Sequence, residues 1–429
     1  ANWVAAEQVD EYVERYRSLY PTHAIKPAEL LAGARESLAA VRRAGGQTLV
    51  VTAKNAANAR LHLDHLDLPV DVVVGDLWGA GKGAALREHG ALMFVGDHVH
   101  DVAGARAAGT LAVAVTTGPC SAAELRSAGA DVVMSSLTDF PSWFEEYVLQ
   151  SRLEALTARL EELGSLVVAF SAGADSAFLV AAAVRALGAD RVAAATGVSA
   201  SLPAAELEAA ERFCAALGVR HLSAATQEMQ RPGYRANAGD RCYFCKAELV
   251  DVLSGLAEQL GVAAVATGTN ADDARAGFRP GIRAAAERGA ATPLLDAGLT
   301  KAQIREASRR WGLPTWDKPA AACLSSRIAY GIEVTPLRLS RVERAESAVR
   351  LALTLRDAEV VNLRVRDLGS RARVEVDSEL VRRLDADPAL SRAVVAAAVA
   401  AGFDHAEIDS RGFRSGAMNE MLADAVRYR

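Results

Sequence analysis

Short apolar runs rich in Val, Leu and Ala alternate with longer stretches rich in Ala, Leu, Arg and Glu along much of the chain. Such runs are typical of buried strands, and the stretches between them have the composition of helices. We expect strands at residues 48–52, 71–75, 92–95, 111–115, 166–170, 192–195 and 263–267. Because strands that alternate with helices form parallel sheets, the two groups of runs predict two α/β domains.

Two changes in this pattern indicate domain boundaries. The sequence FPSW at residues 140–143 precedes a long helical stretch that reaches Gly164. After Pro319 the alternation gives way to a helix and a predicted hairpin of residues 360–366 and 371–376. We therefore expect an N-terminal α/β domain at residues 1–142, a central parallel-sheet domain at 150–318 and a small α+β domain at 319–429.

Length, charge and hydropathy limit the classes of function. A chain of 429 residues is too long for one typical core, and its net charge of -5 and pI near 6.0 argue against binding nucleic acid through a broad positive field. No apolar run approaches the length that spans a bilayer, so we expect no membrane partner. The sequence from Ala1 lacks the basic start and apolar core of a secretory signal, which favours the cytoplasm. A small-molecule substrate fits these properties better.

The expected strand at residues 166–170 runs into S-A-G-A-D-S at residues 171–176, and an apolar helix follows. Small residues let the backbone approach a polyphosphate, Ser171 and Ser176 offer hydroxyl groups, and the amides at a helix N-terminus favour anions. Asp175 could help to hold a divalent cation that bridges the phosphates. Taken alone, the loop is also compatible with an ordinary strand-to-helix turn that has a capping Ser.

This loop resembles the S-G-G-x-D-S loop of the PP-loop ATP pyrophosphatases, which cleave ATP to AMP and pyrophosphate. Ala172 stands where that family usually has Gly, and a positive φ there would cost Ala about 1 kcal/mol. Further motifs follow in order: R-C-Y-F-C-K at residues 241–246, T-G-T-N-A-D-D at 267–273, R-P-G at 279–281, K-P-A-A-A-C-L-S-S-R at 318–327 and R-G-F-R-S-G-A-M-N at 411–419.

In this order the motifs resemble the LarE family of pyridinium-3,5-biscarboxylic acid mononucleotide sulfurtransferases, which serve the nickel-pincer cofactor of lactate racemase. The resemblance covers residues 153–419 and implies an ATP-dependent sulfurtransferase that adenylylates a small carboxylate, releases pyrophosphate and forms a thiocarboxylate with a sulfide or another sulfur donor. It implies a PP-loop domain of the adenine nucleotide alpha hydrolase type that uses ATP and Mg²⁺, and we also expect a homo-oligomer. The residues expected to bind ATP are Ser171, Gly173, Asp175, Ser176, Thr267, Gly268, Thr269, Asn270 and Asp273.

Three cysteines are candidates for the sulfur chemistry. Cys242 and Cys245 lie on one short segment, and folding must bring Cys323 to them from about eighty residues further on. In a reducing compartment the C-x-x-C spacing indicates a metal, a cluster or a redox pair rather than a disulfide. Zinc usually takes four ligands and no His stands near these motifs, whereas three thiolates suit an iron-sulfur cluster with one open iron.

The resemblance favours a [4Fe-4S] cluster held by Cys242, Cys245 and Cys323, because three-cysteine members of the family are thought to carry one. Single-cysteine relatives instead give up the sulfur of the residue that matches Cys323 and form dehydroalanine, so a sacrificial route stays open. Cys214 falls in a helical apolar pattern and is expected in the core.

In the predicted hairpin, charged residues alternate with apolar ones and therefore share one face of the sheet. Periodicity alone predicts that this face is solvated. The resemblance instead implies that Arg364 and Arg366 hold the substrate phosphate near the active cysteine, since guanidinium groups bind phosphate bidentately. Glu346 and Glu375 are weaker candidates for a divalent-metal site, and exposed surface charges explain them equally well.

The N-terminal domain resembles the haloacid dehalogenase-like phosphatases, which have a Rossmann-like fold. The resemblance implies that Thr52 and Lys82 hold a phosphoryl group and that Asp97 and Asp101 hold Mg²⁺. The only Asp before Thr52 is Asp10, which does not end an apolar strand, so the nucleophile is missing and the domain is expected to be inactive. Either the chain begins after that motif or the domain is a scaffold, and the missing initiator Met favours the first explanation.

Two other functions stay open. A tRNA thiolase is one, because other PP-loop proteins with three cysteines modify RNA, although the acidic balance of the chain counts against it. A non-catalytic nucleotide-binding scaffold is the other, and it requires that the loop with Ala172 no longer binds ATP.

Overall fold

The computed structural model of the chain describes residues 8–275, 277, 279–319, 322–414, 418 and 420. The chain folds into two compact units, Ala1–Gln150 and Ser151–Arg429, and the boundary between them lies within helix α7 (Phe140–Leu163). Among the described helices, none combines the length and the apolar character needed to cross a membrane. The division into three domains expected from the sequence stays a prediction.

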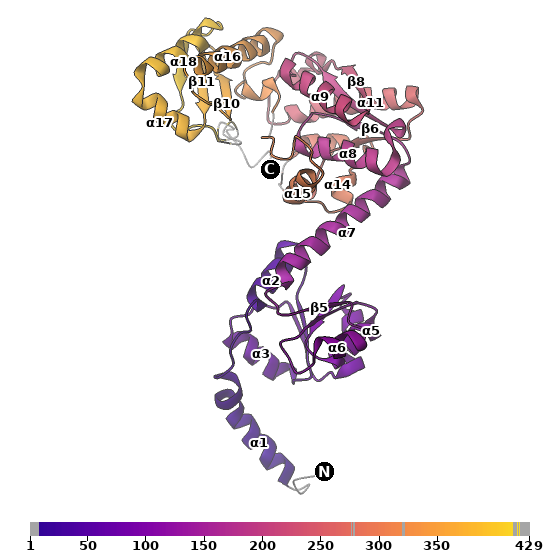
Figure 1. The fold of residues 1–429 in the computed structure, drawn as a ribbon. Coiled ribbons are helices and arrows are strands. Elements are labelled where there is room, and N and C mark those ends of the chain that lie inside the picture. The colour runs from indigo at the N-terminus through magenta and orange to yellow at the C-terminus, as the bar shows by residue number, and fades with distance from the viewer. Residues whose placement is uncertain are drawn as a thin grey trace. The chain divides into compact units, whose positions relative to one another are not determined.

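The first unit contains two small parallel sheets and the helices that connect their strands (Figure 1). One sheet pairs β1 with β2, and the other has the order β3-β4-β5. Its helices and strands are α1 (Val9–Tyr20), η2 (Pro21–Ile25), α2 (Ala34–Arg43), β1 (Leu49–Val51), α3 (Ala56–His65), β2 (Val72–Val74), η3 (Gly79–Gly81), α4 (Lys82–Glu88), β3 (Met93–Gly96), α5 (Val99–Ala108), β4 (Leu111–Val115), α6 (Ala122–Ser127) and β5 (Val132–Met134).

The second unit begins with a four-stranded parallel sheet in the order β8-β7-β6-β9. Alternate residues of the central strand β6, such as Val167 and Ala169, pack against Leu253 and Ala257 of helix α11. Strand β6 is buried along its whole length, as expected for a parallel sheet with helices on both faces. The elements of this part are β6 (Leu166–Ala169), α8 (Ala174–Leu187), η4 (Ala189–Arg191), β7 (Val192–Val198), α9 (Ala204–Leu217), β8 (Arg220–Ala225), η5 (Glu228–Gln230), α10 (Pro232–Arg235), α11 (Arg241–Leu260), β9 (Ala264–Thr267), α12 (Ala271–Arg275), α13 (Pro280–Ala286), α14 (Pro293–Asp296) and α15 (Lys301–Arg310).

A separate core lies between a three-stranded sheet and the helices that follow Cys323 along the chain. Strand β10 pairs with β11 in an antiparallel hairpin, and β12 adds to β11 in parallel. Apolar residues on one face of the hairpin, such as Val365 and Val374, pack with Leu339 and Val342 of helix α16. The elements here are η6 (Leu324–Arg327), α16 (Pro336–Thr354), β10 (Leu363–Asp367), β11 (Arg371–Val376), α17 (Ser378–Ala386), α18 (Pro388–Ala400) and β12 (His405–Ile408).

The mixed α/β fold with parallel sheets is confirmed, and each of the seven expected strands overlaps an observed one. Sequence reasoning missed β5, β8 and β12. Strand β8 starts with Arg220 and His221 and lies at the edge of its sheet, where polar residues remain accessible. Its composition therefore lacks the continuous apolar run that marks a central strand.

Candidate functional site

The predicted phosphate loop connects β6 to α8 and is held by its own serine hydroxyl groups. The Oγ of Ser176 accepts a hydrogen bond of 3.3 Å from the backbone N–H of Ser171 and donates one of 3.2 Å to the Gly173 carbonyl. The Oγ atoms of Ser171 and Ser176 lie 3.2 Å apart. Ala172 has a φ of +52°, so the position does require the left-handed backbone that favours Gly.

Asp175 lies in the first turn of α8, directly after this loop. Its Oδ2 lies 3.4 Å from the Nζ of Lys301, whereas its Oδ1 is buried and has no hydrogen-bond partner among the described residues. An unsatisfied buried carboxylate oxygen is costly, so this atom fits a site completed by a ligand or a cation. An oxygen ligand beside a helix N-terminus suits a divalent cation bound to phosphates.

The second predicted nucleotide segment follows β9, the neighbour of β6 in the sheet. A Cβ atom on Gly268 would lie 2.9 Å from the backbone nitrogen of Ser176, so the two loops approach closely. Thr267 and Thr269 are buried, with their hydroxyl oxygens 3.1 Å apart. The Oδ1 of Asn270, also buried, accepts hydrogen bonds from the first amides of α12. The carboxyl ends of neighbouring strands thus bring both segments together.

Asp273 belongs to the same helix start and borders an open pocket of about 420 Å³. One carboxylate oxygen of Asp273 lies 3.7 Å from a guanidinium nitrogen of Arg279. Arg279 and Arg283 also line this pocket. The pocket therefore combines one acid with two cations, which suits an anionic ligand.

The two C-x-x-C cysteines lie on the first turns of α11, three residues apart and thus on neighbouring positions of one helix face. Burial raises the pKa of Cys245, and the negative charges of Cys323, Glu228 and Cys242 raise it further. The Cys242 side chain reaches the surface, but the protein packed around it removes water from its thiol, and this desolvation raises its pKa. Arg241 opposes the shift, and the charge of Cys323 adds to it. Folding therefore brings Cys323 within electrostatic reach of both thiols.

The three thiols differ in access and do not form a ready metal site. Cys242 and Cys323 are exposed and Cys245 is partly buried. Within the described residues, no group of three or more His, Cys, Asp or Glu side chains is arranged to hold a metal ion. Cys214 is buried in the core, as its helical pattern predicted.

A chain of buried hydroxyl groups supports Cys323, and sequence reasoning missed it. The Sγ of Cys323 lies 3.0 Å from the Oγ of the fully buried Ser325. Tyr234, also buried, places its hydroxyl group 2.5 Å from the Oγ of Ser201. The backbone of Ser201 accepts a hydrogen bond of 2.9 Å from the N–H of Leu324. Burial raises the pKa of Tyr234, and the charge of Cys323 adds to the shift, so the phenol stays neutral.

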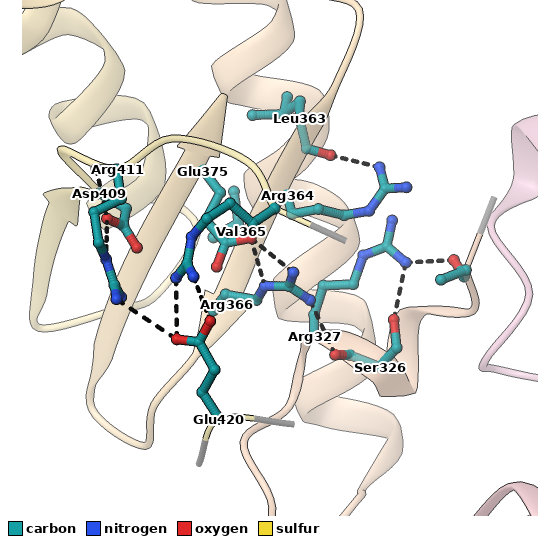
Figure 2. Close-up of polar contacts among 12 residues, drawn as sticks. Ser326, Arg327, Leu363, Arg364, Val365, Arg366, Glu375, Asp409, Arg411 and Glu420 are labelled. Atoms are coloured by element: carbon teal, nitrogen blue, oxygen red, sulfur yellow. Dashed lines mark hydrogen bonds and ion pairs between the residues drawn. The ribbon is translucent and has the colours of Figure 1, made fainter. Parts of the chain in front are cut away.

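The short helix η6 is fastened to α16 by one ion pair and to the hairpin by a hydrogen bond from Arg366. Figure 2 shows Arg366 between Ser326 and Glu375. Arg327 forms a bidentate pair with Glu346, at 2.9 and 3.2 Å, and donates to the Cys323 carbonyl at 2.9 Å. Arg366 forms a bidentate pair with Glu375, at 2.9 and 2.7 Å. Arg366 also donates to the Ser326 carbonyl at 3.2 Å.

The charged face of the hairpin is solvated only in part: Arg371 is exposed, whereas Arg366 and Glu375 are buried, which corrects the expectation from periodicity alone for that pair. The side chains of Arg366 and Glu375 are only 7% and 3% exposed. Glu346 also accepts a hydrogen bond from the Val365 N–H at 3.1 Å, so both acids named as metal candidates are engaged by protein donors. Their geometry favours a structural role.

Arg364 differs from Arg366 in its surroundings. Its guanidinium group donates to the Leu363 carbonyl at 2.7 Å and lies 5.4 Å from the centre of the Phe413 ring. Burial lowers its pKa to about 10, and the positive charge of Arg327 adds to the decrease. Figure 2 shows the side chains of Arg364 and Arg327 side by side. An anion between them would relieve this repulsion.

In the first unit, Lys82 and Asp101 form a largely buried ion pair at 2.6 Å. Asp97 follows β3 and lies against Gly118, where a Cβ atom would collide with its carboxylate. Thr52 follows β1 and its N–H donates to the Val74 carbonyl at 3.0 Å. The structure therefore joins Lys82 to Asp101, and no contact links Thr52 to them among the interactions of the described residues.

Two family models and three curated proteins match parts of the chain. Residues 3–109 match the haloacid dehalogenase-like hydrolase family, and residues 82–140 match a HAD-hydrolase-like family. An uncharacterized protein of Synechocystis is 41% identical over 275 residues, which cover 64% of this chain and 99% of that protein. Pyridinium-3,5-bisthiocarboxylic acid mononucleotide synthase of Lactiplantibacillus plantarum is 30% identical over 278 residues, covering 65% of this chain and 97% of that enzyme. An uncharacterized protein of Methanocaldococcus jannaschii is 29% identical over 144 residues, covering 34% of this chain and 54% of that protein.

The second relative is matched over nearly its whole length at an identity that establishes common descent. The N-terminal matches account for the first unit. The chain therefore belongs to the LarE family of PP-loop sulfurtransferases and carries a haloacid dehalogenase-like domain at its N-terminus.

Proposed function

We propose that this enzyme uses ATP to adenylylate a substrate carboxylate, releases pyrophosphate and converts the carboxylate to a thiocarboxylate. The observation that carries the proposal is the buried Oδ1 of Asp175, which has no partner among the described residues and lies at the N-terminus of α8. A Mg²⁺ ion bound to the phosphates of ATP would satisfy this oxygen. The amides after Gly173 and the hydroxyl groups of Ser171 and Ser176 would hold the departing pyrophosphate.

The loop after β9 would hold the rest of the nucleotide. Thr267, Gly268, Thr269 and Asn270 lie against the phosphate loop, as the close approach of Gly268 to Ser176 requires. Asp273 borders the neighbouring pocket. The left-handed backbone at Ala172 supports ATP binding, because the substituted loop keeps the conformation that a Gly would adopt.

Sulfur transfer then requires a sulfur nucleophile near the acyl adenylate. The thiolate of Cys323 attacks the acyl carbon, AMP leaves, and a thioester forms. If a base then removes the Cα proton of Cys323, the Cβ–S bond breaks, the thiocarboxylate leaves and dehydroalanine remains. Alternatively, an external sulfide attacks the acyl carbon directly and Cys323 keeps its sulfur.

Cys242, Cys245 and Cys323 fit a [4Fe-4S] cluster in kind and in number, since three thiolates leave one iron open. When bound, such a cluster would supply a sulfide on that iron. The described residues do not present a preformed metal site, and the sulfur transfer steps given above use only Cys323 or an external sulfide. We keep the cluster as the proposed sulfur carrier, with the Cys323 route as its alternative.

The proposed substrate is pyridinium-3,5-biscarboxylic acid mononucleotide or a related phosphate-bearing carboxylic acid. The name of the Lactiplantibacillus plantarum relative supports this choice. Three guanidinium groups lie near two carboxylates here, so this group of side chains carries excess positive charge. They belong to Arg327, Arg364 and Arg366 and to Glu346 and Glu375. We propose that Arg364 contacts the phosphate and that Arg366 supports this site through Glu375.

Pyrophosphate release tests the nucleotide part of the proposal. Asp175→Ala should abolish release, whereas Asp190→Ala, which removes an exposed acid at the other end of α8, should not change it. Normal pyrophosphate production by Asp175→Ala would contradict the assignment.

The sulfur route is decided by analysing the anaerobically purified protein for iron and sulfide and by measuring its intact mass after one turnover. Iron with repeated turnover supports the cluster, and each Cys-to-Ser variant should then lose it while ATP still binds. A loss of about 34 Da with a single turnover and no iron supports donation by Cys323.

A further inference from the structure

Lys318 connects the phosphate loop to the segment that carries the candidate sulfur nucleophile. It lies five residues before Cys323, yet its Nζ donates a hydrogen bond of 3.0 Å to the backbone carbonyl of Ala172. The same ammonium group lies 2.7 Å from the Oε2 of Glu206, in the first turn of α9. Both side chains are about three-quarters buried, so their charges are partly shielded from water.

The contact is made to the one residue of the loop whose backbone is strained. Ala172 has a φ of +52° and is 1% exposed, so it holds a left-handed conformation inside the protein. If φ relaxed to a negative value, the peptide plane would rotate and its carbonyl would leave the ammonium group. A charged donor on this carbonyl therefore stabilises the left-handed conformation selectively.

The lysine itself is fixed from two directions. Its own carbonyl accepts a hydrogen bond of 2.9 Å from the guanidinium group of Arg305 on α15. Glu206 holds the ammonium end, and α9 is in turn anchored because the N–H of Ala204 donates to Glu343 of α16 at 3.0 Å. The ammonium group is thus presented to Ala172 by a rigid frame.

We propose that Lys318, held by Glu206, is a positioning residue that keeps the phosphate loop in the left-handed conformation that binds the nucleotide. It compensates for the Ala that stands where Gly would adopt this backbone without strain. The inference rests on the proposed use of ATP, and it adds a specific cause for the shape of the loop. Because Lys318 also begins the segment of Cys323, it joins the nucleotide site to the sulfur site.

A double-mutant cycle between Lys318 and Ala172 tests this role. Calorimetry measures the Kd of the full chain for Mg·ATP in the wild type, Lys318→Met, Ala172→Gly and the double variant. Lys318→Met should weaken binding about tenfold, which corresponds to the strain of one left-handed Ala. In the Ala172→Gly background the same substitution should weaken binding less than about twofold, because Gly needs no such support.

The rescue by Gly separates positioning from other roles. If Lys318 contacted the phosphates or only supported the fold, its loss would weaken binding equally in both backgrounds, and that result would overturn the proposal. Unchanged binding by Lys318→Met would also overturn it. Absence of ATP binding by the wild type would instead refute the proposed function, so the two failures are distinguishable.

Two further variants guard against a misfolded Lys318→Met protein. Glu206→Gln leaves Lys318 in place but removes the negative charge that orients its ammonium group. It should weaken Mg·ATP binding, as Lys318→Met does, and Ala172→Gly should restore the binding. Arg212→Met is the matched control, because Arg212 lies on the same helix and pairs with Glu208 at the surface. This control should bind Mg·ATP as the wild type does. If Glu206→Gln weakens Mg·ATP binding equally in the Ala172→Gly background, the proposed role of the Lys318–Glu206 pair is contradicted.

Discussion

Breaking the buried pair of Arg366 and Glu375 should unfold the second unit at a markedly lower temperature. The two side chains are 7% and 3% exposed and share a bidentate contact, so replacing Arg366 with Met leaves the buried Glu375 charged and without its bidentate partner. Removal of one partner of a buried pair typically costs about 3–5 kcal/mol. The Ser326 carbonyl also loses its donor, which adds about 1 kcal/mol.

The double variant Arg366→Met with Glu375→Met should recover most of this loss. Met has a similar length to both side chains and carries no charge, so the pair becomes an apolar contact beside the core of the hairpin. We expect each single variant to lower the melting temperature of this unit by about 10 °C and the double variant to lower it by only a few degrees. Differential scanning calorimetry of the full chain measures these shifts.

A control pair lies on the same sheet. Arg373 of β11 and Glu407 of β12 pair at 2.8 Å, but their side chains are 29% and 44% exposed. Breaking this pair should cost less than about 1 kcal/mol, because water solvates both partners once they separate. Equal losses at the two pairs, or a double variant at Arg366 and Glu375 as unstable as the sum of its single variants, would refute the reasoning.

Three further outcomes follow from other contacts. Gly268→Ala should weaken Mg·ATP binding in calorimetry without lowering the melting temperature much, because its Cβ would press on the Ser176 nitrogen; binding equal to wild type would contradict this. Thr300→Ala should cost about 1 kcal/mol in thermal unfolding, because Thr300 and Gln303 form a capping box at the start of α15. Burial lowers the pKa of His221, so as the pH falls the unfolded chain binds a proton at a higher pH than the folded chain does. The free energy of unfolding should therefore fall as the pH drops below about 6.5, and His221→Gln should reduce this dependence.

The fold class and the tight turn after β6 could be predicted because local sequence determines them. An apolar run such as residues 166–169 is most stable when it is buried in the middle of a sheet covered by helices, and the small residues after it indicate a tight turn. The comparison with a Gly-containing loop raised a left-handed backbone at Ala172 only as a condition, and the structure shows that the condition holds. The order of the motifs then identified the family before any contact was known.

The support around Cys323 could not be predicted in this way, because it depends on residues that meet only after folding. Tyr234 and Ser201 lie within one hydrogen bond of each other, but neither belongs to a motif. Lys318 was part of a quoted motif, yet its contact with Ala172 joins positions separated by 146 residues. Sequence spacing carries no signal for such pairs.

The hairpin shows why a period of two leaves the fate of a charged face undetermined. Alternation predicts that Arg364 and Arg366 share a face of the sheet. It does not predict whether water or a second layer of protein covers that face. The register places Arg366 opposite Arg373, and its actual partner Glu375 lies diagonally across the strands. Once η6 covers this face, Arg366 is neutralised by Glu375, and the substrate phosphate would have to displace a buried carboxylate to bind it.

Arg364 lies in a different electrostatic environment from Arg366. Opposite it in the register lies Glu375, whose Oε2 is already bound by Arg366 in two hydrogen bonds. Its pKa is lowered by burial and by the neighbouring charge of Arg327, so an added anion stabilises its charged form. A substrate phosphate beside Arg364 would stabilise this charge and leave the pair of Arg366 with Glu375 intact. The two arginines that the sequence treats alike should therefore differ when each is replaced. Replacing Arg364 should lower substrate affinity, and replacing Arg366 should lower stability.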